Sequence, residues 1–322
     1  MILYILFAAL TYLGIQSKLR LNLFSLLAAL IPGLRNYSGK DTLLYMNRLQ
    51  VIQEDQIVWD YEPVLSLIFY LSTVFTKSLT TSWFIANFAY TLIVITVYNF
   101  ICQKFKKNRE RQTTIFINIF FTIIIIDSAF NGMRVGLMIP FALSFLMTEK
   151  FTLMLLAILS HFSGLFLTSL GIIKRYKIPL FIFIIIGFTF LNEIQGLIEL
   201  NERINSKYIR YTQTNNVSKY SGLIDLIVGF LLFISSNIKP YIRSILLIVI
   251  VPFILLHILK LSEFYGIFRL YRLIIILGIY TIFRKGVVNM KLLAISCLVF
   301  ALNFIKQFIL TYGDEGGFLP FK

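Results

Sequence analysis

Apolar runs recur from one end of the chain to the other, and short polar or basic stretches separate them. Most runs are long enough, or nearly so, to cross a bilayer core of about 30 Å. Strand-type alternation is absent, and a helix satisfies its own backbone hydrogen bonds in lipid. The pattern therefore predicts an all-α, polytopic integral membrane protein with about 10 to 12 transmembrane helices, including re-entrant or partial ones. No repeat or low-complexity tract interrupts it, so we expect a single transmembrane domain, residues 1–322.

The direction of each span follows from the basic loops, because Lys and Arg concentrate on the cytoplasmic side. The strongest basic cluster, residues 104–111, is placed in the cytoplasm. Full crossings are predicted at Ile2–Ile15, Leu21–Leu34, Ser82–Ile101, Thr113–Ile126, Val135–Met147, Ile178–Phe190, Leu223–Ile234, Ile245–Leu259, Phe268–Phe283 and Leu292–Leu310. Two larger polar stretches, Arg35–Glu62 and Asn192–Tyr220, become external loops, and the C-terminal Asp314–Lys322 is also external.

Pro63–Thr76 is apolar but has no place as a full crossing, since one span already joins the first external loop to the basic cluster. We predict a helix that dips into the outer leaflet. Pro63 suits the first turn of such a helix, where its missing N–H costs nothing. Glu62, just before it, suits the positive end of the helix.

A second partial insertion is predicted between the basic residues at Lys150 and at Lys174. Two short apolar arms, Phe151–Leu159 and Leu165–Ile173, meet between them at residues 160–164. A broken or re-entrant hairpin fits, with His161 at its tip, because non-helical backbone at membrane depth must line protein or a watery cavity. The alternative is one full span with the later basic residues outside.

Composition agrees with a membrane protein, since 58% of the residues are hydrophobic and the mean hydropathy is +0.83. The net charge of +15 sits in short loops, so the positive-inside bias explains it and no nucleic-acid partner is expected. Cys102 and Cys297 match no metal or redox spacing, and there are only two histidines. We expect neither a metal site nor a cofactor. The apolar N-terminus is expected to be a first span, not a cleaved signal peptide.

Ionisable residues within membrane-length apolar segments default to a functional interpretation, which draws attention to Arg134 and His161. The predicted topology gathers further polar groups on the external side: Asp41, Tyr45, Glu62, Asp127, Arg203, Arg210, Glu263, Arg269 and Arg272. Arginine suits phosphate because it is always charged and offers paired donors. Such cations stabilise the charge that develops on a departing diphosphate. A histidine or carboxylate nearby can accept a proton from an attacking sugar hydroxyl.

Each of these residues also has a structural explanation. Arg134 can be an interface anchor, and His161 a satisfied hydrogen-bonding group between helices. Arg269 and Arg272 share one helix face and can pair with Glu263. Glu62 can be a helix N-cap and no more.

Several short motifs occur in a fixed order over roughly residues 35 to 275. They are Asp41 with Tyr45, Glu62-Pro63 opening an apolar helix, Arg134-Val135-Gly136-Leu137, His161-Phe162-Ser163 after the next apolar run, and the aromatic stretch Phe264–Arg272. In these motifs the chain resembles the EpsG/Wzy-type polysaccharide polymerases of bacterial surface-glycan gene clusters. It departs from that family at Val64, where glycine is more usual, and at Met138 and Ile139, where small residues are common.

The resemblance implies a glycosyltransferase of the bacterial cytoplasmic (inner) membrane that polymerises O-antigen, capsule or exopolysaccharide repeat units. These would be carried on undecaprenyl diphosphate and joined at the outer face without a metal. Carried over to this chain, Arg134 binds the diphosphate together with Arg269 or Arg272, and His161 or Glu62 is the base or orients the acceptor. By the same resemblance, Asp41 and Tyr45 contact sugar, and Arg210 is a further substrate-binding residue. Membrane lipids, a chain-length regulator and a flippase are the expected partners.

Other function classes also place polar groups in a helical membrane protein. A lipid-linked oligosaccharide flippase or transporter usually shows internal repeats and binding groups near the midplane. Here polar groups gather on one face and no repeat is visible, which favours a polymerase. An O-antigen-ligase-like transferase is chemically close but uses another acceptor. An acyltransferase of surface sugars would place its site at the midplane or the cytoplasmic side.

Overall fold

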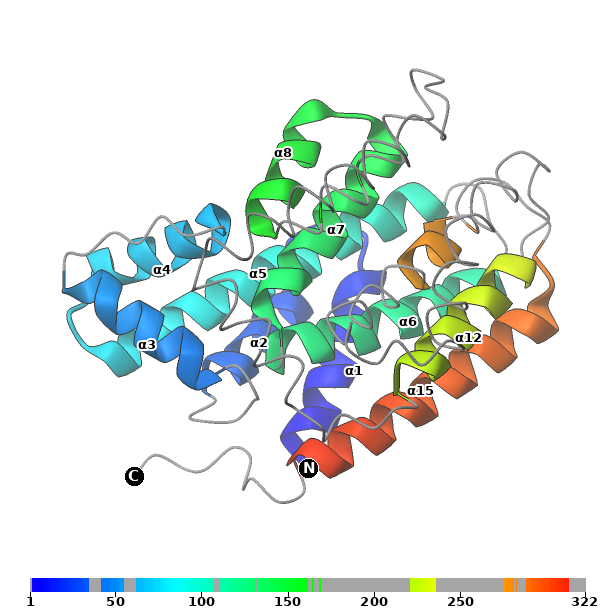
Figure 1. The fold of residues 1–322 in the computed structure, drawn as a ribbon, viewed down its shortest axis with the longest axis horizontal. Helices are drawn as coiled ribbons and strands as arrows, with labels where there is room; N and C mark the ends of the chain where they lie inside the picture. The colour runs from blue at the N-terminus through cyan, green and yellow to red at the C-terminus, as the bar shows by residue number, and fades with distance from the viewer. Residues whose placement is uncertain are drawn as a thin grey trace, which may run out of the picture. The chain divides into compact units, whose positions relative to one another are not determined.

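A computed structural model describes residues 2–34, 42–54, 62–106, 111–130, 132–161, 164, 168, 221–235, 275–280, 282 and 288–312. Within these ranges the regular elements are α-helices, as the sequence predicts (Figure 1). The chain forms two compact units, Met1–Thr168 with Cys297–Lys322 and Ser169–Ser296. The expectation of one domain stays a prediction.

The first unit is organised around α5. Its helices are α1 (Ile2–Gln16), α2 (Leu23–Gly33), α3 (Thr42–Gln53), α4 (Pro63–Phe75), α5 (Leu79–Lys106), α6 (Arg111–Phe130), α7 (Met133–Thr148), α8 (Phe151–Ser160) and the end of α15 (Met290–Tyr312). α5 packs against α1, α2, α3, α4, α6 and α7, and Figure 1 shows it running among them. α8 packs on α7 and α4. α8 therefore links α4 to α7.

The second unit contains α12 (Ser221–Ser235), a short helical run at 275–280 and the start of α15. The short run packs closely on α12, because a Cβ added to Gly278 would lie 2.8 Å from Leu232 Cβ. Asn289 joins α12 to α15. Its backbone N–H donates to the Ser235 carbonyl at 2.8 Å, and its side-chain oxygen accepts from the first backbone amides of α15.

Helices occur where most of the described spans were predicted. Leu79–Lys104 and Gln112–Phe130 are each long and apolar enough to cross a membrane. The shorter apolar helices are Ile2–Gln16, Leu23–Gly33, Pro63–Phe75, Met133–Thr148, Phe151–Ser160 and Met290–Ile305. The predicted spans Ile178–Phe190 and Ile245–Leu259, and the external loop Asn192–Tyr220, lie outside the described residues. The number of bilayer crossings stays a prediction.

The first external loop differs from its prediction, because Arg35–Glu62 contains the helix α3. Tyr45, Leu49 and Ile52 are buried at i, i+4 and i+7, which is the spacing of one helix face. That face packs against α4 and α5. Leu44 of the same helix is apolar but exposed, so apolar positions are not confined to the buried face and the sequence indicates this helix only weakly.

Buried amides fix the turn between α1 and α2 onto α5. Asn99 Nδ2 donates to the carbonyls of Gly14 and Leu19 at 2.7 and 2.9 Å. Asn22 Nδ2 donates to the same two carbonyls at 3.0 and 3.1 Å, while its Oδ1 accepts from Ser25 N and caps α2. A buried polar group needs such partners. The N-terminal helix pair is therefore held in a fixed register against α5.

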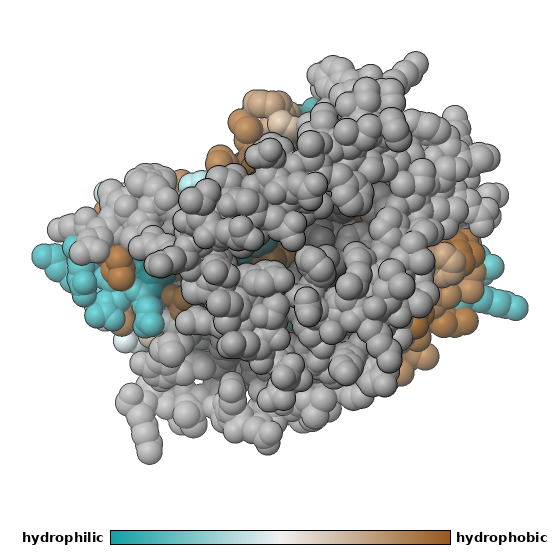
Figure 2. Space-filling model, in the orientation of Figure 1, coloured by the Kyte–Doolittle hydropathy of each residue, from teal (hydrophilic) through white to brown (hydrophobic). Residues whose placement is uncertain are grey.

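Large apolar side chains are exposed along several helices. On α4 they lie at i, i+3, i+4, i+7 and i+8, namely Leu67, Tyr70, Leu71, Val74 and Phe75, and the last is 75% exposed. The largest brown areas in Figure 2 lie at the place of α8 and where α12 meets the start of α15. Apolar surface on this scale marks an interaction with a membrane or another protein.

Candidate active site

Glu62 stands at the N-cap of α4, directly before Pro63. Its backbone carbonyl accepts from Leu65 N and Ser66 N, both at 3.1 Å, so the first turn of α4 is closed by the main chain. Its side chain makes no capping hydrogen bond. The carboxylate instead turns toward arginines from other helices and is 8% exposed. A purely capping role for Glu62 does not fit this geometry.

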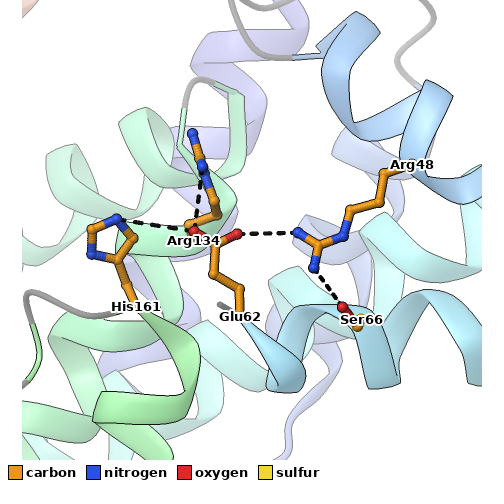
Figure 3. Close-up of polar contacts among 5 residues, drawn as sticks. All are labelled: Arg48, Glu62, Ser66, Arg134 and His161. Atoms are coloured by element: carbon orange, nitrogen blue, oxygen red, sulfur yellow. Dashed lines mark hydrogen bonds and ion pairs between the residues drawn. The ribbon is translucent and has the colours of Figure 1, made fainter. Parts of the chain in front are cut away.

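Arg48 of α3 binds Glu62 from one side. Its Nη1 donates to Glu62 Oε2 at 3.1 Å, and its Nη2 donates to Ser66 Oγ at 2.5 Å (Figure 3). Glu62 and Ser66 are four residues apart, so they lie on one face at the start of α4. The guanidinium of Arg48 is thus attached at two points, and its side chain is 12% exposed.

Arg134 approaches the other oxygen of the same carboxylate. It is the second residue of α7, and its Nη1 donates to Glu62 Oε1 at 3.3 Å. The Arg134 side chain is 23% exposed, and its guanidinium carbon lies 5.9 Å from the centre of the Tyr45 ring. Such a cation over an aromatic face is attracted by the ring quadrupole. Tyr45 is buried in α3, so it supports Arg134 from within the protein.

The position of Arg134 depends on close packing two residues later. A Cβ added to Gly136 would overlap the Tyr90 hydroxyl and Ser128 Cβ. Tyr90 OH donates to the Ser128 carbonyl at 3.2 Å, which links α5 to α6 at this point. Only glycine lets the α7 backbone approach both neighbours so closely. The spacing of arginine and glycine in the motif therefore has a packing reason.

His161 ends α8 and faces the same carboxylate. It is the C-cap residue with extended backbone, φ −165° and ψ 139°. Gly164 N donates to its carbonyl at 2.8 Å, and a Cβ at Gly164 would lie 2.5 Å from the Ala157 carbonyl oxygen. Gly164 therefore packs closely against the last turns of α8. A break at the histidine is what the predicted hairpin requires, although its depth in the membrane stays a prediction.

His161 Nε2 lies 4.0 Å from Glu62 Oε1, longer than a hydrogen bond, and its side chain is 29% exposed. Figure 3 shows Nε2 turned toward the carboxylate and Nδ1 turned away from it. Oε1 thus faces both Arg134 and His161, whereas Oε2 faces Arg48.

Burial raises the pKa of Glu62 above the ordinary value of 4.5, while the positive charges of Arg134 and Arg48 act in the opposite direction. Two guanidinium groups share this one carboxylate, so positive charge is in excess among the four groups. The more exposed side of the cluster, formed by Arg134 and His161, is therefore suited to an anion.

Four of the predicted site residues come together: Glu62, Arg134, His161 and Tyr45. The others lie outside the described residues, namely Asp41, Arg210, Arg269 and Arg272. Arg48 and Ser66 belong to the cluster but were not predicted. The helical spacing of Tyr45, Leu49 and Ile52 is the available signal for a helix that carries Arg48, and it is weak because Leu44 is apolar and exposed.

Metal ligation was not expected from the sequence. Within the described part of the chain, no group of three or more His, Cys, Asp and Glu side chains is arranged to hold a metal ion. Glu62 is close to His161, but its other neighbours in the cluster are arginines, which repel a cation. Independence from metals stays a prediction.

Comparison with known proteins adds one match. The model described as EpsG family matches residues 18–322 of this chain, which includes every member of the cluster from Arg48 to His161. No curated protein and no solved structure matches the chain.

Proposed function

This chain belongs to the EpsG family, and from that premise we propose that it polymerises the repeat units of a bacterial surface polysaccharide. Family membership and the apolar helices indicate a membrane protein of exopolysaccharide biosynthesis. The finer proposal is a metal-independent glycosyltransferase acting on undecaprenyl-diphosphate-linked oligosaccharides, as the resemblance to Wzy-type polymerases implies. O-antigen, capsule and exopolysaccharide units are all compatible with it.

One observation carries the proposal. Glu62 is held between Arg48 and Arg134 while His161 faces the same carboxylate. Leaving-group stabilisation requires fixed positive charge, which the guanidinium groups supply. Acceptor activation requires a base whose orientation is set by a neighbouring group, as in other acid–base pairs. Both requirements are met within a single cluster at the ends of α4, α7 and α8.

The proposed step transfers the growing chain from its carrier to an acceptor sugar. His161 Nδ1 takes the proton of the acceptor hydroxyl, and that oxygen forms a bond with the anomeric carbon of the donor. The bond from this carbon to the diphosphate oxygen breaks, and its electron pair leaves with the carrier diphosphate beside Arg134. His161 then releases the proton to water. Glu62 stabilises the charged imidazole that exists between these events.

The exposed apolar surfaces support a multi-pass location in the cytoplasmic membrane. The stripe on α4 begins five residues after Glu62, so the cluster is adjacent to surface suited to lipid. A carrier with a long polyprenyl chain would approach the cluster from within the bilayer. We propose that the cluster faces the outer leaflet, where a flippase delivers the donors and a chain-length regulator acts on the product.

Arg134→Ala tests the proposal in cells that lack their own polymerase. We expect long glycan chains to disappear from a gel ladder while single repeat units remain, because donors are made but not joined. Arg20→Ala is the matched control, since Arg20 lies over the Phe100 ring away from the cluster. It should leave the ladder unchanged.

Protein levels in the membrane must be equal in both variants for the comparison to hold. A normal ladder with Arg134→Ala would overturn the proposal. Loss of single repeat units as well as long chains would favour the flippase alternative, since acceptor units would then no longer reach the outer face.

A further inference from the structure

The two arginines of the cluster are attached to Glu62 in different ways. Arg48 is fixed at two points, to Glu62 Oε2 and to Ser66 Oγ, at 3.1 and 2.5 Å. Arg134 meets Glu62 Oε1 at the longer distance of 3.3 Å. Its side chain is also about twice as exposed, at 23% against 12%. The contact of Arg134 is therefore the weaker of the two and the more accessible to a ligand.

We propose that Arg48 is a positioning residue that serves as the permanent counter-ion of Glu62, so that Arg134 can exchange Glu62 for an anionic substrate group. The idea rests on the proposed function, in which the anion is the diphosphate of a lipid carrier. With Arg48 and Ser66 holding Oε2, the carboxylate keeps its place when Arg134 leaves. Oε1 can then accept a hydrogen bond from His161 Nε2–H. Before the exchange, His161 Nε2 lies 4.0 Å from Glu62 Oε1.

The exchange links substrate binding to activation of the base. A buried carboxylate without a cationic partner is costly. If Arg134 were the sole partner of Glu62, its transfer to an anionic substrate would incur that cost. A second arginine removes that cost. Donation from His161 Nε2 to Oε1 also fixes the neutral ring with Nδ1 as the acceptor, which is the nitrogen turned away from Glu62 in Figure 3.

Among the described residues, the charged groups that face Glu62 come from three neighbouring helices: Arg48 from α3, Arg134 from α7 and His161 from α8. α5 also packs on α4, but its charged residues, Lys104 and Lys106, are at its C-terminal end. Ser66 contributes only a hydroxyl. Arg48 is thus the partner that stays with the carboxylate if Arg134 moves to an anion.

Binding of inorganic pyrophosphate to the purified full chain tests the exchange without requiring polymerisation. Arg134→Gln should abolish binding. Arg48→Gln should weaken it about tenfold or more, because Arg134 must then remain with the carboxylate. Glu62→Gln should bind at least as tightly as wild type. The decisive variant is Arg48→Gln combined with Glu62→Gln, in which we expect wild-type affinity to return.

A double variant that stays as weak as Arg48→Gln would show that Arg48 contacts the anion itself and would overturn the proposal. Lack of wild-type binding would also overturn it. The glycan ladder of Arg134→Ala decides the proposed function separately, because that assay does not depend on the affinity for pyrophosphate.

The pH dependence of polymerisation gives a second readout. Protonation of Glu62 removes the charge that orients His161, so the rate should fall as the pH is lowered. The positive charge of Arg48 lowers the pKa of Glu62, so its removal should move this fall to higher pH. Arg48→Lys keeps the charge and should restore the wild-type midpoint. An unchanged midpoint in Arg48→Gln would contradict the counter-ion role.

Discussion

Glu62 holds the cluster together because its two carboxylate oxygens face different helices. Arg48 of α3 binds one oxygen, and Arg134 of α7 binds the other. An unpaired charge this well buried would cost several kcal/mol, so the arginines offset a penalty that the burial of Glu62 creates. At the scale of single residues, the negative charge of Glu62 is therefore the property to test.

Glu62→Gln keeps the size of the side chain and removes that charge. We expect polymerisation to fall by a factor of about 10² or more, because His161 loses the group that orients it. Glu62→Asp keeps the charge on a shorter side chain and should retain part of the activity. Chain formation by purified protein on lipid-linked repeat units measures both. Equal rates for the Glu62→Gln variant and the wild type would exclude a role for the charge.

The sequence was informative about residues that stand out locally. Glu62, Arg134 and His161 were recognised because each is an ionisable group at the edge of an apolar segment. Arg48 does not stand out in this way, because it lies in a segment whose polar composition predicts a loop. Even with α3 recognised, its contact with Glu62 depends on how α3 packs against α4, and no local pattern specifies that packing.

At the scale of helices, the packing of α7 positions Arg134. α7 lies against α5 and α6, and Gly136 is a point of close approach to both. Tyr90 and Ser128 occupy the space that a side chain at this position would need. Any residue larger than glycine must therefore push the start of α7, and Arg134 with it, away from Glu62.

Gly136→Ala should lower the stability of the purified protein by about 1 to 3 kcal/mol through overpacking. It should also impair polymerisation, because Arg134 moves. Gly132→Ala is a matched control near the same helix end, where an added Cβ meets nothing within 4 Å. It should cost less than Gly136→Ala. Thermal unfolding in detergent compares the two, and similar melting temperatures would contradict the close-packing argument.

Helix positions were largely predictable, and the reason is physical. The length of an apolar run is a local property, so the predicted spans coincide with α1, α2, α5, α6, α7 and α15. The short α4 and α8 also appeared where partial insertions were predicted. α3 was the exception, since apolar and polar residues alternate irregularly along it and polar residues lie on both sides of it.

At the scale of the whole molecule, the predicted topology places the cluster on one side of the membrane. The charge pattern of the loops predicts the outer side, but that pattern does not specify which helix ends meet. Residues 48, 62, 134 and 161 come together through contacts that span most of the first unit. Contacts this distant in sequence leave no periodic signal, which is why the composition of the cluster could not be predicted in full.

His161→Cys tests the predicted side of the membrane. A membrane-impermeant maleimide should label it on intact cells, since the side chain of His161 is 29% exposed. The natural Cys102 and Cys297 are buried and should give little background. Lys18→Cys, in the turn predicted to be cytoplasmic, should react only after permeabilisation. The reverse pattern for the two variants would overturn the topology.

The hydrogen bonds of Asn99 have a consequence for the biogenesis of the protein. Asn22 can reach the carbonyls of Gly14 and Leu19 as soon as the first helical hairpin leaves the ribosome. Asn99 reaches the same carbonyls from 85 and 80 residues away, so its bonds form only after α5 has been synthesised. The hairpin can thus enter the membrane early in a shape of its own. We expect the arrival of α5 to lock the hairpin in place before the rest of the chain is complete.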